Sequence, residues 1–327
     1  MKNIMCREKA AMGRYRDAFN RMDFALEDIC IKYNTGKIHF YVDALWCYIR
    51  YGVTPNEYIS FQFYRYNHFE RKTFFTARHA AKYEEKLNDR ANYHVFWDKE
   101  KTNEVFREFI KRDYLYVQTA QDEEIKNFIT KHKSILLKPN NASSGKGIRL
   151  YTGQTISQLR EENLLLEEYV VQHEKMAKLN PSSVNTVRIY TILDDTQIPH
   201  ILSASIRVGG INSVVDNYHS GGVGYPLDIK TGVVCGPGSN LTSANFLYHP
   251  GNNVKVIGFE VPQWDKIIEF VNRLCLVIPT ARFIAWDIAI LQDGLELIEA
   301  NYDGDPGFMQ SPLKQGKLIE IRKWTRT

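Results

Sequence analysis

The sequence has few cysteines and no long apolar run, and both features restrict the kinds of protein that it can encode. Its five cysteines are an odd number among 327 residues, lie far apart and form no C-x-x-C pair. This argues against a disulfide framework or a zinc site and favours a reducing compartment. No run approaches the roughly 18 apolar residues that a membrane helix needs, and the first residues show no apolar secretory signal. We therefore expect a cytoplasmic protein with no transmembrane segment; a peripheral membrane association stays open, because substrates can be lipid-linked.

Internal repeats, low-complexity segments and a strong charge imbalance are also missing. Hydrophobic residues make up 44% of the chain and charged residues 24%, with a formal net charge of +4. This ordinary globular balance excludes a disordered or collagen-like chain. The pI near 8.6 suits an anionic substrate, but no basic patch is concentrated enough to indicate nucleic acid. The length allows two or three packed subdomains.

Three regions differ in composition and in predicted secondary structure. Residues 1–92 are predicted to be mainly helical, and their dense aromatic run at 58–66 is expected to pack in a helical layer rather than stack on bases. Residues 93–165 alternate between helix and strand. Residues 166–327 are dominated by strands, interrupted by one helix from Asp265 to about Pro279 whose apolar residues repeat at helical spacing.

The first motif with chemical content runs from Lys138 to Ile148. A short apolar strand delivers a lysine, and a loop of small residues leads back into a strand. Small residues let backbone N–H groups approach phosphate oxygens, and lysine supplies a positive charge. The spacing is not a Walker A loop, because Asn140 occupies the place of its first glycine, and it is not G-x-G-x-x-G either. A hairpin turn with a solvated lysine explains the pattern equally well.

The second motif is the strand segment from Leu166 to Glu174, with an acidic pair at Glu167 and Glu168. By itself, an acidic pair that faces solvent is the simpler interpretation. The segment gains meaning because it follows a phosphate loop at a spacing that can build an adenine slot. There, backbone groups of the exposed strand end would bind the base edge, and a nearby acid would hold the ribose hydroxyls.

The third motif is a β-hairpin near the end of the sequence. Two strands, 284–291 and 295–301, combine apolar residues with a few acidic ones. Their connection, Gln292-Asp293-Gly294, is predicted to be a three-residue loop with Gly294 in the left-handed conformation. The length of this loop sets which residues of the two strands face each other.

The predicted register brings three oxygen-bearing side chains together. With three residues in the loop, Asp287 lies opposite Glu299, and Asn301 points to the same face. A two-residue Asp293-Gly294 turn would instead place Asp287 and Glu299 on opposite faces. Two carboxylates and an amide on one face suit Mg²⁺, whereas an unpaired carboxylate pair in an apolar hairpin is costly. We favour a metal site over the alternative, in which a neighbouring lysine or arginine neutralises the pair.

In this order, the three motifs resemble those of the ATP-grasp superfamily, and the chain is most similar to its sugar-transfer-associated branch, which is related to alpha-L-glutamate ligases. The resemblance covers roughly residues 50–310. It implies an α+β ATP-grasp fold: a helical region 1–92, then an N-terminal subdomain, 93–165, and a C-terminal subdomain, 166–327, that grip ATP between them. The matching segments are 138–148, 166–171, 184–191, 215–222, 249–251, 286–287 and 299–301.

The resemblance implies two lysines at the phosphates of ATP. Lys138 would match the family lysine that contacts them, and Lys99 looks like an earlier lysine with the same role, with Lys101 close enough to compete. The glycine- and serine-rich loop would fold over the phosphates. Its residues are Ser143, Ser144, Gly145, Lys146 and Gly147.

The resemblance also implies where the base and the ribose bind. The backbone from Glu168 through Tyr169 to Val170 would form the adenine hinge, with Glu167 as the alternative start. Glu174 would bind the ribose. These residues follow the phosphate loop in the order that the family shows.

The metal and substrate residues follow from the same resemblance. Asp287, Glu299 and Asn301 would be the ligands of Mg²⁺, with Mn²⁺ as an alternative ion. Arg188 would meet the transferred phosphoryl group or the acyl phosphate, which makes Arg188 and Lys138 the expected catalytic residues. The substrate side would be lined by Asp216, Asn217, Gly221 and Gly222.

The implied activity is ATP- and Mg²⁺-dependent ligation of a carboxylate to an amine through an acyl phosphate. The partners would be small-molecule or glycan-linked substrates, such as a cell-surface polysaccharide precursor or an amino-acid derivative, and a homodimer is left open. One alternative is a kinase of a sugar or glycan hydroxyl. Another is a nucleotide-binding partner of glycosyltransferases without turnover. On the ligase interpretation, Asp287→Asn is expected to lose turnover while staying folded.

Overall fold

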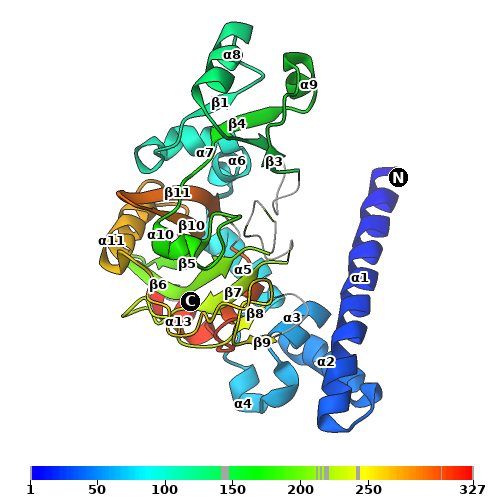
Figure 1. Cartoon of the computed structure of the whole chain (residues 1–327). Coiled ribbons are helices and arrows are strands. Elements are labelled where there is room, and N and C mark those ends of the chain that lie inside the picture. Colours follow the sequence, from blue (N-terminus) through cyan, green and yellow to red (C-terminus); the bar gives the residue numbers. More distant parts are fainter. Residues whose placement is uncertain are drawn as a thin grey trace.

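The computed structural model describes residues 2–140, 147–210, 213, 216, 221–240, 244–302 and 304–325 of the chain. Figure 1 shows a helical N-terminal part, a small sheet and a large sheet. Among the described residues, none of the helices combines the length and the apolar character that crossing a membrane requires.

The N-terminal part is helical and has an aromatic core. Tyr58, Phe61, Phe63 and Phe74 are buried, and the rings of Phe61 and Phe74 lie 5.0 Å apart. The aromatic run is thus a packed helical layer, as expected from the sequence. The elements of this part are α1 (Lys2–Tyr33), α2 (Lys37–Tyr51), α3 (Pro55–Ser60), the 3₁₀ turn η1 (Phe63–Arg65), α4 (His68–Arg71) and α5 (Ala77–Leu87).

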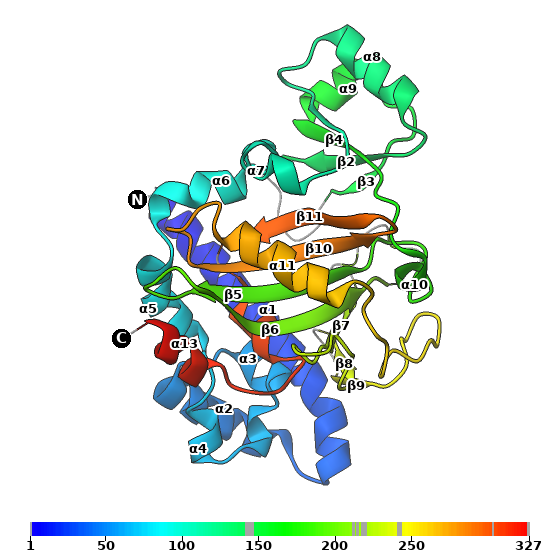
Figure 2. The same cartoon turned by 90° about the vertical axis from the view of Figure 1, so that its left-hand side faces the viewer.

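Short helices connect this part to a four-stranded antiparallel sheet. The connecting elements are η2 (Arg90–Asn92), α6 (Tyr93–Trp97), α7 (Lys99–Val105) and η3 (Arg107–Phe109). The sheet has the order β1-β4-β2-β3, from β1 (Tyr114–Tyr116), β2 (Ile135–Pro139), β3 (Arg149–Leu150) and β4 (Leu164–Glu168). Two helices, α8 (Asp122–Lys131) and α9 (Ile156–Glu161), pack on it through buried Ile125, Phe128 and Leu159 (Figure 2).

The large sheet has seven antiparallel strands in the order β11-β10-β5-β6-β7-β8-β9. One face is covered by α11 (Trp264–Cys275), which crosses the sheet in Figure 2 and buries Ile267, Val271 and Leu274. The other face is covered by α5, α12 (Pro306–Gln310) and α13 (Leu318–Thr325). A short helix, α10 (Glu174–Ala177), links the two sheets. The strands are β5 (Thr186–Leu193), β6 (Pro199–Val208), β7 (Val223–Pro226), β8 (Gly238–Ser239), β9 (Ala244–Phe246), β10 (Phe283–Leu291) and β11 (Gly294–Asn301).

The hairpin β10–β11 pairs Asp287 with Glu299, as expected, but the predicted loop is wrong. Leu291 pairs with Gly294, so the connection has two residues, Gln292 and Asp293. Gly294 has a φ of +137° and begins β11 instead of closing the loop. Continued without interruption, this register would place a different residue, Ile298, opposite Asp287.

A β-bulge corrects the register. Asp287 pairs with Glu299, whereas its neighbour Ile288 pairs with Leu297, so Ile298 is the extra residue on β11. Because side chains alternate between the faces of a sheet, this one insertion moves Glu299 to the face of Asp287. A bulge also increases the local twist and re-aims the side chains beside it, a device often found next to active sites. The shared face is therefore produced by the bulge and not by the loop.

Candidate functional site

The hairpin β10–β11 brings the three expected oxygen-bearing side chains together. Asp287 is directly opposite Glu299 and is only 1% exposed, whereas Glu299 and Asn301 are half-buried. The Asn301 amide nitrogen lies 3.5 Å from Asp287 Oδ2 and 3.4 Å from the Ala285 carbonyl oxygen. That orientation leaves the Asn301 carbonyl oxygen for another contact. Directly opposed carboxylates repel each other, so the pair needs a neighbouring cation.

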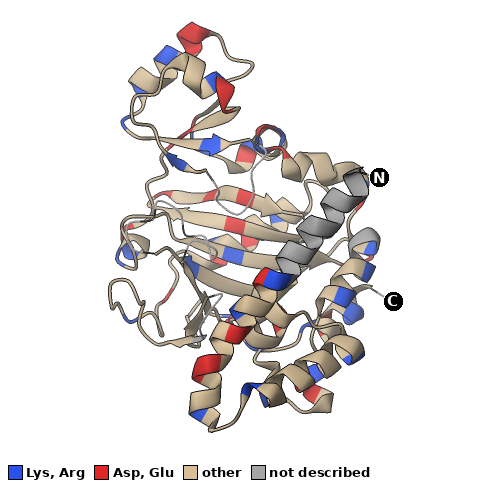
Figure 3. Ribbon diagram, turned by 90° about the vertical axis from the view of Figure 1, so that its right-hand side faces the viewer, with Lys and Arg blue, Asp and Glu red and all other residues tan. Residues whose placement is uncertain are grey.

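Two arginines bind Asp287. Arg188, its cross-strand partner on β5, donates from Nε to Oδ1 at 2.7 Å and from Nη2 to Oδ2 at 2.6 Å. Arg207 on β6 donates from Nη1 to Oδ2 at 2.7 Å. Burial would raise the pKa of Asp287, but the charges of Arg188 and Arg207 outweigh it and lower the pKa below its ordinary value. Figure 3 shows acidic and basic segments on neighbouring strands of the large sheet.

Glu299 differs from Asp287 in its partners. Within the described part of the chain, its side chain makes no ion pair and accepts no hydrogen bond. Its charge is nevertheless felt by Lys99, whose pKa it raises, and by Arg188. The expected alternative, neutralisation by a neighbouring cation, therefore describes Asp287, while Glu299 keeps its carboxylate for a ligand.

Asp216 holds Arg207 in place. Arg207 Nη2 lies 2.9 Å from Asp216 Oδ1, and Asp216 Oδ2 accepts hydrogen bonds from the Thr186 amide and hydroxyl. Burial raises the pKa of Asp216, opposed by the nearby Arg207. The structure thus places Asp216 beside the arginines of the site. Among the other expected substrate residues, Asn217 lies outside the described residues, and Gly221 and Gly222 directly precede β7.

Lys138 sits at the end of β2 in a buried ion-pair network. Its Nζ lies 2.5 Å from Glu167 Oε2, and Arg112 Nε lies 2.8 Å from the same oxygen. Burial would raise the pKa of Glu167, but Arg112 and Lys138 lower it to about 2. Arg112 also donates to Glu296 Oε1 at 2.7 Å, which ties β4 to β11. Glu167 is 2% exposed, so it does not belong to a solvent-facing acidic pair.

Lys99, the first residue of α7, reaches the end of β2, where Lys138 lies. Asp98 caps that helix by accepting hydrogen bonds from the amides of Glu100 and Lys101. Lys99 Nζ donates to the carbonyl oxygens of Pro139 and Asn140, both at 3.1 Å, where the small-residue loop begins. Burial and the positive charge of Lys138 lower the pKa of Lys99. Lys99 and Lys138 thus reach the start of this loop from two elements, as the predicted phosphate site requires.

The loop itself is described only at its end. Ser143, Ser144, Gly145 and Lys146 lie outside the described residues. Gly147 has a φ of +76°, and a Cβ there would lie 2.9 Å from Pro139 Cγ. Only glycine fits this turn without strain or a shift of the proline. The turn returns the chain to β3 directly beside the end of β2.

The expected hinge follows β4. Glu167 pairs with Tyr114 on one side and with Leu136 on the other, and Glu168 pairs with Ile135, so the backbone of both residues is engaged in the sheet. The Glu168 amide donates to the Asp113 carbonyl at 2.9 Å, and the Tyr169 amide donates to that of Ser134 at 3.0 Å. Val170 lies beyond these bonds, half-buried.

Glu174 lies beyond the hinge. It is the first residue of α10 and is exposed. The amide of the preceding residue, His173, donates to the Ile290 carbonyl on β10 at 2.7 Å. Glu174 is therefore anchored beside the hairpin that carries Asp287 and Glu299.

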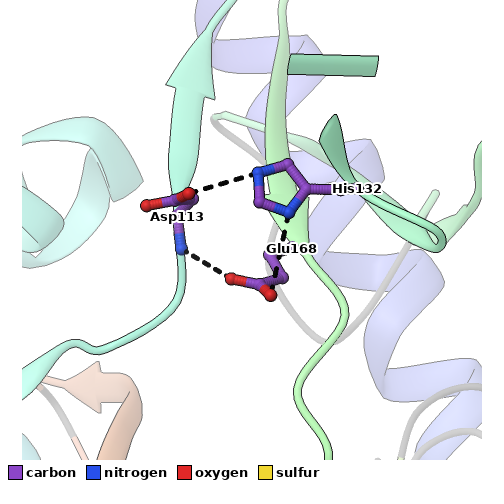
Figure 4. Close-up of side chains that lie close together, drawn as sticks. All are labelled: Asp113, His132 and Glu168. Atoms are coloured by element: carbon purple, nitrogen blue, oxygen red, sulfur yellow. Dashed lines mark hydrogen bonds and ion pairs between the residues drawn. The ribbon is translucent and has the colours of Figure 1, made fainter. Parts of the chain in front are cut away.

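A cluster of Asp113, His132 and Glu168 fixes the base of the hinge (Figure 4). His132 Nε2 lies 3.2 Å from Asp113 Oδ2, and its Nδ1 lies 3.7 Å from Glu168 Oε1. The Asp113 amide donates to Glu168 Oε2 at 3.2 Å. The exposed Lys131 pairs with the same Asp113 oxygen, so this carboxylate already has a cationic partner. The cluster connects the end of β4 to the residue that precedes β1 and to the residue that follows α8.

The family of the chain follows from one match. A family model described as sugar-transfer associated ATP-grasp matches residues 155–323, more than half of the chain. The chain belongs to this ATP-grasp family. The membership confirms the resemblance and the expected α+β ATP-grasp fold, which here follows a helical N-terminal part. No curated protein sequence is significantly similar to the chain.

Several solved ATP-grasp structures are similar at low identity. The ATP-grasp ligase PsnB, complexed with a phosphomimetic variant of minimal precursor, Mg and ADP, is 13% identical over 78% of this chain and 66% of its own, with a TM-score of 0.44. The ADP complex of N5-carboxyaminoimidazole ribonucleotide synthetase is 12% identical over 63% and 45%, with a TM-score of 0.40. The D-alanine–D-alanine ligase of Bacillus anthracis is 8% identical over 75% and 76%, with a TM-score of 0.40. This chain spans less than two thirds of the first two proteins, and its family assignment rests on the family model.

The donor set fits the divalent cation that an ATP-grasp enzyme binds. Asp287, Glu299 and Asn301 offer hard oxygen donors on one face, which Mg²⁺ prefers over nitrogen or sulfur. Glu299 keeps a half-buried carboxylate with no protein cation on it among the described residues. Lys99 lies close enough to Glu299 on this ATP-grasp hairpin for the Glu299 charge to oppose the lowering of the Lys99 pKa.

Two charged residues of this ATP-grasp site were not singled out from the sequence. Arg207 lies in an apolar strand, and the argument that a cation in mid-strand needs a partner, applied to Arg188, would have found it too. Arg112 stands in the run Lys111-Arg112-Asp113 without any local signal. Its partner Glu296 is 184 residues away, so only the fold reveals the pair.

Proposed function

We propose that the protein is an ATP- and Mg²⁺-dependent ligase that joins a carboxylate to an amine through an acyl phosphate. The observation that supports this most is the convergence of cations and oxygen donors between the two sheets. Lys99 and Lys138 lie at the end of the small sheet, and the large sheet presents the metal face of Asp287, Glu299 and Asn301. Fixed charges of this kind stabilise phosphoryl transfer mainly by positioning and electrostatics.

Each group has a defined part in the proposed reaction. Lys99 and Lys138 hold the phosphates of ATP, while the backbone from Glu168 to Val170 binds the base. Mg²⁺, held by the metal face, supplies charge neutralisation at the transferred phosphate. Arg188 orients the substrate carboxylate for attack on the γ-phosphate, while Asp287, fixed by Arg207, holds Arg188 in place. An amine then displaces phosphate from the acyl phosphate.

The low basicity of Asp287 favours a carboxylate nucleophile over the hydroxyl of a kinase substrate. A hydroxyl needs a base that accepts its proton, whereas a carboxylate attacks without one. Asp287 is the buried carboxylate beside Arg188 and Arg207, and both of its oxygens accept hydrogen bonds from them. Its pKa is lowered, which makes it a weak base. We place the substrate among cell-surface polysaccharide precursors and amino-acid derivatives, and the enzyme in the cytoplasm.

An ADP-release screen over paired carboxylates and amines tests the ligase. We expect release that requires Mg²⁺ and a carboxylate, and an amide as the product by mass spectrometry. Hydroxylamine in place of the amine should trap the acyl phosphate as a hydroxamate. A phosphate ester formed on a sugar hydroxyl, with no requirement for a carboxylate, would establish the kinase instead. Nucleotide binding without turnover for any pair would favour the non-catalytic alternative.

We predict that ATP binding is coupled to proton uptake by Lys99. Burial and Lys138 lower its pKa in the protein without nucleotide, and a triphosphate beside it would raise the pKa again. Between the two pKa values binding therefore takes up protons, and the affinity for ATP rises as the pH falls. Calorimetric titrations in buffers of different ionisation enthalpy measure this uptake. Lys99→Arg, which does not titrate, should lose it; equal uptake by wild type and variant would show that Lys99 is not at the phosphates.

A further inference from the structure

Helix α2 is apolar on both of its faces. Its inner face buries Phe40, Cys47 and Tyr51 against the aromatic core. Its outer face is equally apolar but exposed, at intervals of four, three and four residues: Ile38 77%, Val42 65%, Leu45 61% and Ile49 66%. This is the spacing at which helices pack side by side. A helix that is apolar all round normally lies in an interior.

The neighbouring helix α1 extends this exposed surface. Its buried residues, Met22 and Leu26, face the aromatic core. Phe24 and Ile31, seven residues apart, are 63% and 80% exposed and share the opposite side of the helix. We name Phe24, Ile31, Ile38, Val42, Leu45 and Ile49 the outer face of the α1–α2 hairpin. Figure 1 shows α2 and the adjoining end of α1 at the edge of the molecule, away from the small sheet.

Ion pairs within the hairpin balance the charges beside the outer face. Lys37 Nζ lies 3.0 Å from Asp23 Oδ2 and 3.2 Å from Glu27 Oε1. Asp43, the one acidic residue of α2, points inward to Arg71 at 2.7 Å. Around the outer face, residues 16–51 contain five lysines and arginines and five aspartates and glutamates; residues 2–15 of α1, which precede the outer face, add four basic residues and one acidic residue. The balance around the outer face does not suit an anionic membrane, which recruits helices with an excess of basic residues, but it suits an identical surface.

We propose that the outer face is the contact between two copies of this chain. A two-fold axis would place the hairpins against each other as a four-helix bundle, in which the same patch is used on both sides. The six side chains expose on the order of 800 Å² per copy, about what each partner buries in a stable interface. The contact lies in the N-terminal helical part and is independent of the proposed activity.

The oligomeric state tests the proposal, with a matched pair of helical isoleucines. Ile49 on the outer face and Ile319 on α13 are 66% and 63% exposed. In sedimentation velocity from about 1 to 100 µM, wild type should sediment as a dimer of the 38.0 kDa chain. Ile49→Glu should weaken dimerisation at least 100-fold, and Ile319→Glu should not. Both substitutions are at exposed positions, so circular dichroism should show unchanged helix content, and Val42→Glu provides a second outer-face variant.

Three results would overturn the proposal. A wild type that stays monomeric at all concentrations would show that two copies of the chain do not associate. A dimer that Ile49→Glu and Val42→Glu leave intact would place the contact elsewhere. Flotation of a monomeric wild type with phosphatidylglycerol vesicles, abolished by Ile49→Glu, would assign the outer face to a membrane.

Discussion

Replacing Glu299 with glutamine is expected to lower ATP turnover about 1,000-fold while leaving the thermal unfolding midpoint almost unchanged. The substitution keeps the shape of the side chain and removes the charge that a metal ligand needs. Within the described residues Glu299 makes no ion pair and accepts no hydrogen bond, so its loss strands no buried partner. ADP release under saturating Mg²⁺ and a melting curve on the same sample provide the two measurements.

Two further variants make this test selective. Glu299→Asp keeps the charge but shortens the side chain, so turnover should fall less and the half-saturating Mg²⁺ concentration should rise. Full activity of Glu299→Gln at wild-type Mg²⁺ dependence would remove Glu299 from the metal face. If Glu299→Gln and Glu299→Asp both lowered the thermal unfolding midpoint by the same amount, Glu299 would contribute to stability instead of metal binding.

Asp287→Asn is a less informative test, although the sequence made it the natural choice. Asp287 neutralises Arg188 and Arg207 and is 1% exposed. Removing one partner of a buried ion pair costs about 3–5 kcal/mol, because the remaining charges stay buried. We therefore expect this variant to lose stability as well as turnover, contrary to the expectation from the sequence that it stays folded. Its inactivity alone would not identify a metal ligand.

The same residues show how far the sequence could predict the site. Acidic residues in an apolar hairpin are visible as a pattern, so Asp287, Glu299 and Asn301 could be proposed together. The pairing of Asp287 with Glu299 was predicted correctly, but from a wrong loop length. The loop has two residues, and the shared face depends on the bulge at Ile298. Nothing in the local sequence marks that bulge. It forms where β10 is paired on both sides, so the packing of the whole sheet selects it.

Partners that are distant in the sequence were the least predictable. Lys138 was found because it ends an apolar strand before a loop of small residues. Glu167 was given two simple roles, solvent-facing acid or hinge backbone, because its partner Arg112 lies 55 residues earlier. The family match covers residues 155–323, so both Lys138 and Arg112 precede it. Their link to Glu167 comes from the antiparallel pairing of β1, β4 and β2.

Arg112→Met is expected to lower the free energy of unfolding by about 3–5 kcal/mol near neutral pH. The side chains of Arg112, Glu167 and Glu296 are each 2–3% exposed. Methionine fills a similar volume but leaves Glu296 without its cation and Glu167 with Lys138 alone. A matched surface pair provides the control: Arg149 lies 2.7 Å from Glu162, with the two side chains 36% and 46% exposed. Arg149→Met should cost less than about 1 kcal/mol in urea unfolding.

The pH dependence of this loss distinguishes a buried charge from lost packing. In wild type the pKa of Glu167 is lowered from 4.5 to about 2, so its ion pairs stabilise the fold above pH 4.5 and are lost as the pH falls towards 2. Without Arg112 the effect of burial is opposed by Lys138 alone, and the pKa of Glu167 rises. Protonation then relieves the buried charge, so the difference between variant and wild type should narrow below about pH 4.5. A difference that stays constant with pH would mean that Arg112 acts through packing. Arg112 also joins β4 to β11. If the loss of stability comes from the buried charge, Arg112→Met should bind ATP more weakly than wild type at neutral pH.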